Sequence, residues 1–220
     1  MSKKGEVFLK RFRKVLVVLL AILVPVSIGF GFNFFSGESS GSVENQAMTV
    51  AGELTVNKVS ETQNLVPGDK ICNGVTMNIT SSAVSLLRVK VDVNYAEANS
   101  TNYQQATDIA PITSPGDNWL KGSDGYYYYT QGVGDVNKEG IVKQVILAED
   151  GIYFNGVDNA VDMNKYQGKK IKVKAEAELV QAKHGAFAQK WGLNQDDDGN
   201  IYTKLKQISD DQEKSDAQGQ

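Results

Sequence analysis

Apolar and polar residues alternate along much of the chain after about residue 50. In segment 87–95, leucine, valine and tyrosine occupy the odd positions, and arginine, lysine, aspartate and asparagine occupy the even ones. Segment 171–179 repeats this pattern, and shorter versions occur at 50–56 and 71–79. A period of two is typical of β-strands with one buried and one solvated face. The pattern therefore predicts several antiparallel strands.

Turn signals separate these strands. Val-Pro-Gly-Asp occupies 66–69, Ser-Pro-Gly-Asp occupies 114–117, and Ser-Asp-Gly occupies 123–125. Only 184–191 has a helical pattern, and no long amphipathic helix is evident. Many short strands with turns between them predict an all-β fold: an antiparallel β-sandwich of jelly-roll type with long loops and one short helix, preceded by an N-terminal signal helix.

The strands span residues 43–208, which we interpret as the jelly-roll domain. Within it, 96–113 is polar and has no periodicity, which indicates a long surface loop. Residues 209–220 contain Ala217 as their only apolar side chain, so we expect a disordered polar tail there.

The first 31 residues have the composition of an export signal. Six lysines and arginines between Lys3 and Lys14 precede an apolar stretch that runs from Val15 to Gly31. Gly29 and Gly31 supply the small residues that a signal peptidase requires, so we expect cleavage after Gly31 and a secreted product in the extracellular matrix or at the cell surface. An uncleaved membrane anchor is the main alternative, because the apolar stretch is near the lower length limit for a membrane span.

Charge and cysteine content narrow the choice of partners. Removal of residues 1–31 takes six of the 23 basic and one of the 26 acidic residues, which leaves a net charge of about −8. An acidic chain of this kind is not expected to bind nucleic acid. Cys72 is the only cysteine, so no intramolecular disulfide can form.

Catalytic constellations are missing from the sequence, and we expect no enzymatic activity. His184 is the only histidine, so neither an HExxH zinc site nor a Ser-His-Asp triad can be assembled within the chain. We interpret His184 as a surface residue at a helix start. Cys72 lies inside a predicted strand, and we interpret it as a small packed residue.

One acidic run has the spacing of a calcium loop. Asn194, Asp196 and Asp198 fall at loop positions one, three and five, Gly199 falls at six, and Asn200 follows. Leu205 stands at position twelve, where a bidentate glutamate is expected, so calcium is a possible cofactor rather than an implied one. The alternative is an Asp-Gly turn that leads into a strand at 201–203.

Four consecutive tyrosines at 126–129 would place two rings on each face of a strand. Such rings usually pack within a sheet. A carbohydrate-binding platform is the alternative interpretation.

Five segments, in order along the chain, resemble a known family. They are Phe32-Asn33-Phe34-Phe35-Ser36, Leu65-Val66-Pro67-Gly68-Asp69, Leu87-Arg88-Val89-Lys90-Val91, Trp119 with 124–129, and 175–182 with 186–192. They are similar to segments of the TasA and camelysin family of secreted biofilm-matrix fibre proteins, and the aromatic segment resembles that of BsaA-like members. Members of this family are exported with a dedicated signal peptidase of the SipW type.

The resemblance implies a jelly-roll subunit that polymerises with copies of itself by donor-strand exchange. Residues 32–42 would then be the donor segment and its linker, with Phe32, Asn33, Phe34 and Phe35 entering the next subunit. Implied partners are a SipW-type signal peptidase and other matrix or cell-surface components. The alternatives are a membrane-anchored adhesin that binds sugar through 96–113 and the tyrosine run, and a camelysin-like metalloprotease, for which the chain lacks ligand histidines.

Overall fold

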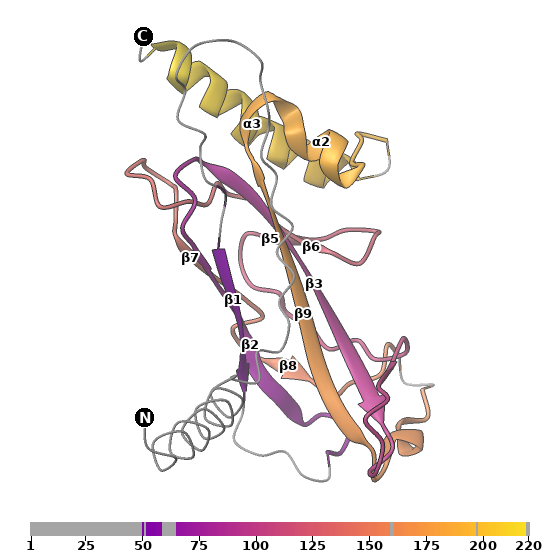
Figure 1. Cartoon of the computed structure of the whole chain (residues 1–220). Helices are drawn as coiled ribbons and strands as arrows, with labels where there is room; N and C mark the ends of the chain where they lie inside the picture. Colours follow the sequence, from indigo (N-terminus) through magenta and orange to yellow (C-terminus); the bar gives the residue numbers. More distant parts are fainter. Residues whose placement is uncertain (1–49, 51, 59–64, 159–160, 197, 219–220) are drawn as a thin grey trace, which may run out of the picture. The chain divides into compact units, whose positions relative to one another are not determined.

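The computed structural model describes residues 50, 52–58, 65–158, 161–196 and 198–218, which form two antiparallel sheets and two α-helices (Figure 1). The strands are β1 (Gly52–Lys58), β2 (Lys70–Ile79), β3 (Ser85–Ala96), β4 (Gln104–Gln105), β5 (Trp119–Lys121), β6 (Tyr127–Tyr129), β7 (Gln144–Leu147), β8 (Ile152–Tyr153) and β9 (Lys170–Gln181). The helices are α2 (Ala186–Trp191) and α3 (Gly199–Gln218), with short 3-10 turns η1 (Met163–Tyr166) and η2 (Lys183–Gly185). The prediction of a mostly β protein with two antiparallel sheets is confirmed.

The two sheets are built around β2 and β3. In the β2 sheet the order is β1-β2-β7, and β8 also pairs with β2. In the β3 sheet the order is β4-β3-β6-β5, and β9 pairs with β3 on its other side.

The main core lies where the inward faces of the two sheets meet. Its fully buried members include Leu54, Val75, Met77 and Leu147 from the β2 sheet, and Leu87, Val89, Ala177 and Leu179 from the β3 sheet. Except for Leu147, whose strand β7 was not predicted, these are residues that the alternating pattern assigned to one face of each strand. Burial of this apolar surface is the main stabilising contribution to the two-sheet arrangement.

A bulge in β2 changes which of its residues point toward the core. Gly74 has φ of +92°, and a Cβ there would lie 2.5 Å from the backbone oxygen of Ala148, so only glycine fits. The register of β2 is irregular around this residue. As a result Cys72 is buried, whereas Ile71, which the simple alternation placed on the core face, is only half-buried.

β3 and β9 pair in register over twelve residues without interruption. On their outer face, side chains of opposite charge lie directly across from each other: Arg88 faces Glu178, Lys90 faces Glu176, and Asp92 faces Lys174. Cross-strand pairs of opposite charge favour one register over its neighbours. The charges therefore help to fix the alignment of the two longest strands.

One end of the β3 sheet is covered on its outer face by the helices (Figure 1). Leu86, Tyr128 and Val180 of the sheet join a second apolar cluster with residues of the helical segment, among them Phe187, Trp191, Leu193, Ile201 and Leu205. The sheet is thus buried on both faces at this end. The short helix predicted at 184–191 is confirmed by η2 and α2.

The predicted disordered tail at 209–220 is wrong over residues 209–218, and so is the strand considered at 201–203. Both belong to α3, a helix of 20 residues that crosses the expected domain boundary at 208. Its first half is held by apolar packing of Ile201 and Leu205, whose spacing of four matches one helix face. Its second half is held by polar contacts: the Ser209 hydroxyl accepts a hydrogen bond from the Gly185 N–H, and Glu213 accepts one from the His184 N–H.

The segment 96–113 is largely irregular, as expected, apart from the two-residue strand β4. It is not confined to the surface, because Ala106 and Ile109 are buried in a third cluster with Phe154 and Tyr166. Val93, near the end of β3, belongs to the same cluster.

Candidate functional site

β9 forms an edge of its sheet that no other strand covers within the described residues. It pairs with β3 on one side along its whole length of twelve residues, and no described strand pairs with its other side. Unpaired backbone groups along a sheet edge form a template for another strand.

The register shows which backbone groups point outward from β9. In an antiparallel strand the N–H and C=O of one residue point to the same side, and successive residues alternate. Ser85 exchanges two backbone hydrogen bonds with Val133, and the Val93 oxygen accepts one from the Ala106 N–H. Odd-numbered residues of β3 therefore point away from β9, and even-numbered ones point toward it.

The same rule gives the direction of the backbone groups of β9, because even-numbered residues of β3 pair with even-numbered residues of β9. The hydrogen bond from the Ala182 N–H to the Val84 oxygen, at 2.9 Å, continues this pairing beyond the strand. The outward N–H and C=O groups consequently belong to the odd-numbered residues, which are Ile171, Val173, Ala175, Ala177 and Leu179. Their side chains are the apolar ones.

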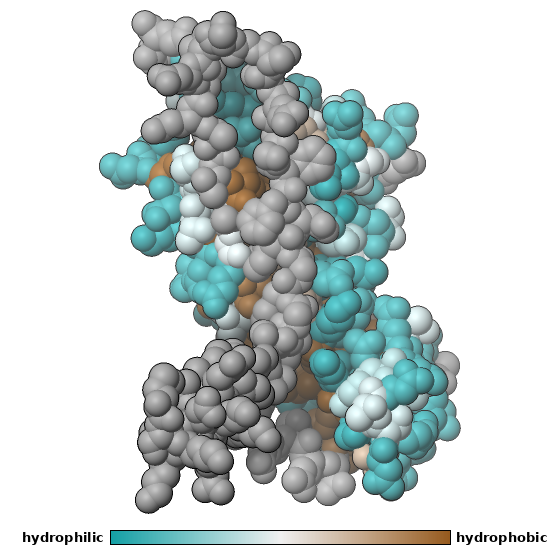
Figure 2. All heavy atoms as spheres, in the orientation of Figure 1, coloured by the Kyte–Doolittle hydropathy of each residue, from teal (hydrophilic) through white to brown (hydrophobic). Residues whose placement is uncertain are grey.

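The core beside this edge is only partly covered. Val56, Val91 and Val173 pack against the main core but remain half-buried. On the face drawn in Figure 2, brown, apolar atoms reach the surface in separate patches among the teal, hydrophilic ones. We call the strip between β1 and β9, which these valines line, the β1–β9 seam.

The seam narrows at its end near the helices. A Cβ on Gly52 would lie 3.3 Å from Cδ1 of Leu179 and 2.9 Å from the Asn78 oxygen. The absence of a side chain at Gly52 therefore lets the start of β1 lie against the end of β9. Toward Val56 and Val173 the apolar side chains become less buried, so the seam is more open there.

A buried ionic cluster around Arg88 lies on the outer face of the same strands. The guanidinium donates hydrogen bonds to both oxygens of Glu178, at 3.0 and 3.1 Å from Nη2, and to Asp124, at 3.3 Å. The Tyr128 hydroxyl donates to Asp124 at 2.6 Å. Burial, followed by this hydrogen bond, raises the pKa of Tyr128.

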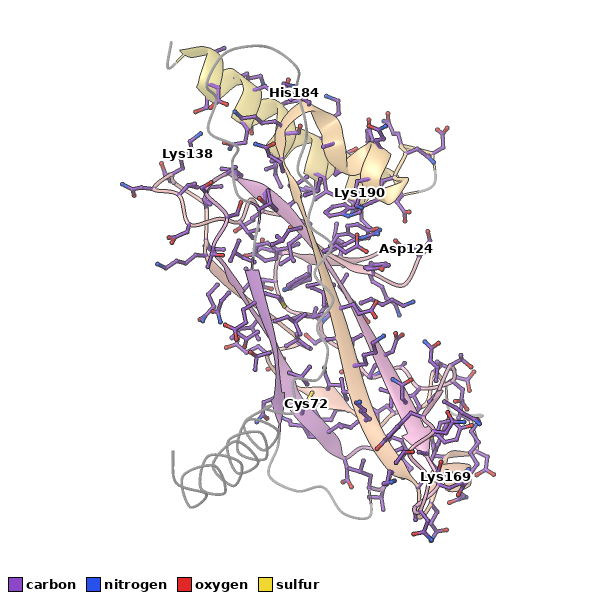
Figure 3. The ribbon with its side chains drawn as sticks, viewed as in Figure 1. Cys72, Asp124, Lys138, Lys169, His184 and Lys190 are labelled. Atoms are coloured by element: carbon purple, nitrogen blue, oxygen red, sulfur yellow. The ribbon has the colours of Figure 1, made fainter. Side chains whose placement is uncertain are left out.

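Aromatic rings enclose the guanidinium. The carbon at its centre lies 3.9 Å from the ring centroid of Tyr126 and 5.1 Å from that of Trp191 in α2. Asp124 reaches the cluster from the turn between β5 and β6 (Figure 3). The cluster thus joins β3, β9, this turn and α2. Its guanidinium, carboxylates and tyrosine hydroxyls bond to one another, which suits a structural role, whereas Nε1 of Trp191 is buried and has no hydrogen-bond partner among the described residues.

The residues of the expected calcium loop are placed differently from those of an EF-hand. The Asp198 carboxylate accepts hydrogen bonds from the backbone and the hydroxyl of Ser123, and the Asn194 side chain accepts one from the Asp196 N–H. Asn200 already lies within α3, and Leu205 at position twelve is fully buried. The part of the chain with described positions contains no group of three or more His, Cys, Asp or Glu side chains arranged to hold a metal ion.

The tyrosine run packs within the sheet. Tyr127 and Tyr129 face the main core and Tyr128 faces the helices, and all three rings are buried. The alternation of rings between the two faces is confirmed. Tyr126, whose ring lies against the Arg88 guanidinium, is half-buried.

Cys72 is packed inside a strand and His184 lies at the surface at a helix start, as predicted (Figure 3). Burial raises the pKa of the Cys72 thiol, and its sulfur lies 4.0 Å from the Gly74 oxygen. His184 is 85% exposed, lies in the left-handed region with φ of +59°, and faces Glu213.

The remaining predicted site residues lie outside the described residues. They are the cleavage residues Gly29 and Gly31 and the donor residues Phe32, Asn33, Phe34 and Phe35. The sequence interpretation missed both the open edge of β9 and the Arg88 cluster. The opposite charges at the even positions of 87–95 and 171–179 were a signal that these two strands pair with each other.

Comparison of the chain with models of protein families found no match, and comparison with curated proteins found none either. Among the helices with described positions, none combines the length and the apolar character needed to cross a bilayer.

Proposed function

We propose that this chain is an extracellular structural subunit, a jelly-roll-type sandwich, which polymerises into biofilm-matrix fibres by donor-strand exchange. The observation that carries the proposal is the edge of β9 at residues 171–179, with which no described strand pairs. Stable monomers protect such edges with charged side chains, bulges, prolines, inward-pointing charges or short strands. β9 carries lysines and glutamates on its outer face, but it has no proline, no bulge in its register with β3 and no inward-pointing charge, so its edge can still accept a strand from another molecule.

The sequence offers a matching strand at residues 32–35. Phe32, Phe34 and Phe35 form an apolar tip, followed by the polar linker 36–42. In a strand Phe32 and Phe34 share one face, and burial of these two rings would contribute roughly 3–6 kcal/mol before the cost of ordering the segment. Cleavage after Gly31 by a SipW-type signal peptidase would free this tip, so export would permit assembly.

Deletion of residues 32–35 tests the proposal. We expect the deleted mature chain to fold, as judged by circular dichroism, and to remain monomeric in light scattering, with no filaments in electron micrographs. Deletion of residues 37–40 from the linker is the matched control, since it removes the same number of residues and leaves the aromatic tip intact. Filaments of undiminished yield without residues 32–35 would rule out this segment as the donor.

N-terminal sequencing of the extracellular product tests the processing step. We expect a start at Phe32. A product that begins at Met1 and stays in the membrane fraction would instead support the anchored adhesin.

A further inference from the structure

The second half of α3, residues 209–218, contacts the rest of the fold through polar side chains. We infer that this half of the helix is an electrostatic latch, which is docked at low ionic strength and released at high ionic strength. We call residues 209–218 the latch helix. This inference goes beyond the proposed function, and neither secretion nor polymerisation is needed for it.

One row of side chains connects the latch helix to other elements. Its members have the helical spacing i, i+3, i+4 and i+7, and they are Ser209, Gln212, Glu213 and Asp216. None of them is apolar, and Ala217, the only apolar side chain at positions 209–217, is exposed. Without packing, a helical segment of this length is at best marginally stable in water. The polar row therefore has to hold the latch helix in place.

The turn η2 supplies backbone donors to this row (Figure 3). The N–H of His184 donates a hydrogen bond to Glu213 at 2.8 Å, and the N–H of Gly185 donates one to Oγ of Ser209 at 3.1 Å. Both donor residues have left-handed backbone conformations, with φ of 59° and 58°. Consecutive N–H groups in tight turns can form a concave site for anions. The backbone of η2 is thus shaped to receive a carboxylate.

Two lysines from other elements contact the end of the latch helix. Lys183 forms an ion pair with Asp216, and Nζ of Lys138 lies 3.6 Å from the same carboxylate. Lys138 also donates a hydrogen bond to Gln212 at 3.1 Å. The last turn of α3 itself contains no basic residue. Because partial negative charge accumulates at a helix C-terminus, Asp216 would destabilise this end without a nearby cation.

Salt should weaken these contacts more than it weakens the packing of the first half of α3. The side chains of Lys138, Lys183 and Asp216 are 41%, 28% and 39% exposed, so ions in solution can screen their attraction. The Debye length falls from about 30 Å at 0.01 M to about 3 Å at 1 M ionic strength. Apolar packing of Ile201 and Leu205 does not depend on this attraction. The open state would leave the two lysines free to bind other acidic groups.

Amide hydrogen exchange of the purified protein at about 0.01 M and about 1 M sodium chloride tests the latch. We expect exchange at residues 209–218 to be at least about tenfold faster at the higher concentration. Exchange at residues 201–207 should change by less than about twofold. Equal rates at 209–218 under the two conditions would overturn the inference. Fast exchange there at low salt would overturn it as well, because the helix would then not be docked.

Two double variants with the same change of charge locate the effect. Glu213→Gln with Asp216→Asn neutralises the acids of the docked row, and we expect fast exchange at 209–218 at both salt concentrations. Asp210→Asn with Asp211→Asn is the matched control, because it neutralises two acids whose ion partners belong to α3 itself. We expect the control to keep slow exchange at low salt and the response to salt.

The helix dipole alone predicts the opposite result for the first variant. Neutral side chains near a helix C-terminus stabilise an undocked helix, so exchange would become slower in Glu213→Gln with Asp216→Asn. Slower exchange in that variant would therefore refute the latch. Lys138→Gln with Lys183→Gln leaves the sequence of α3 unchanged, and we expect it to reproduce the fast exchange at 209–218. Exchange as slow as in the unmodified protein at low salt would show that these lysines do not hold the helix.

Discussion

Replacement of Leu205 by alanine measures how much α3 contributes to the stability of the fold. The Leu205 side chain is fully buried where the helix packs on the outer face of the β3 sheet. The substitution removes three carbon atoms, worth about 2.4 kcal/mol by transfer from water. Incomplete collapse of the cavity adds to this cost, so we expect the free energy of unfolding to fall by about 3 kcal/mol.

Urea denaturation followed by tryptophan fluorescence gives the measurement. Trp191 belongs to the same cluster as Leu205, and Trp119 lies in the main core, so the two tryptophans report on both layers. For a domain of this size, a loss of 3 kcal/mol corresponds to a decrease in Tm of about 6–12 °C. Lys204→Ala is the matched control, because Lys204 is exposed on the same helix and should change stability by less than about 0.5 kcal/mol.

A loss below about 1 kcal/mol for Leu205→Ala, close to that of the Lys204 control, would refute the packing argument. Residues 199–218 would then behave as the dispensable tail that their composition suggested. A large loss would show that the helix belongs to the cooperative unit.

Two further predictions concern buried polar groups. Arg88→Met leaves Glu178 and Asp124 without their cation, so we expect the free energy of unfolding, measured by urea denaturation, to fall by about 3 kcal/mol. A decrease below about 1 kcal/mol would contradict a structural role for the cluster. Burial raises the pKa of Tyr166 and of the tyrosines at 127–129 above the ordinary value of about 10, and in Tyr128 and Tyr166 a hydrogen bond to a carboxylate raises the pKa further. The folded state keeps these hydroxyls neutral, so their ionisation should not change the free energy of unfolding below about pH 10. Above about pH 10 the free energy of unfolding should fall, because the unfolded chain releases these protons more easily. Absorbance at about 295 nm should show that these tyrosines ionise only on unfolding.

The sequence predicts strands well where their alternation is regular. Segments 87–95 and 171–179 appear in the structure as β3 and β9, with the expected residues turned toward the core. The prediction is less accurate at 71–79, because the bulge at Gly74 shifts the phase and buries Cys72 in place of Ile71. A bulge of this kind depends on a close approach to Ala148, more than seventy residues away, which no local pattern reveals.

α3 was missed for a different reason. Its apolar positions are sparse, and its second half carries almost none. That half is helical because its polar side chains find partners elsewhere in the fold, as Ser209 does with Gly185 and Asp216 does with Lys183 and Lys138. The composition of such a segment predicts disorder, because the partners that hold it in place are distant in sequence.

The open edge also could not be predicted, because alternation does not distinguish an edge strand from a central one. β3 and β9 have the same pattern of apolar and charged residues, yet β3 has neighbours on both sides and β9 has a described neighbour on one. Pairing partners are a property of the assembled sheet.

Folding and assembly use different residues of β9. The even positions carry the charges that match β3, and their backbone groups bond to it. The odd positions contribute side chains to the core and direct their backbone groups to the open edge. A substitution that changes only an outward N–H should therefore alter polymerisation without altering the stability of the subunit. One at an even position should weaken the subunit first, and its effect on fibres should follow from that loss.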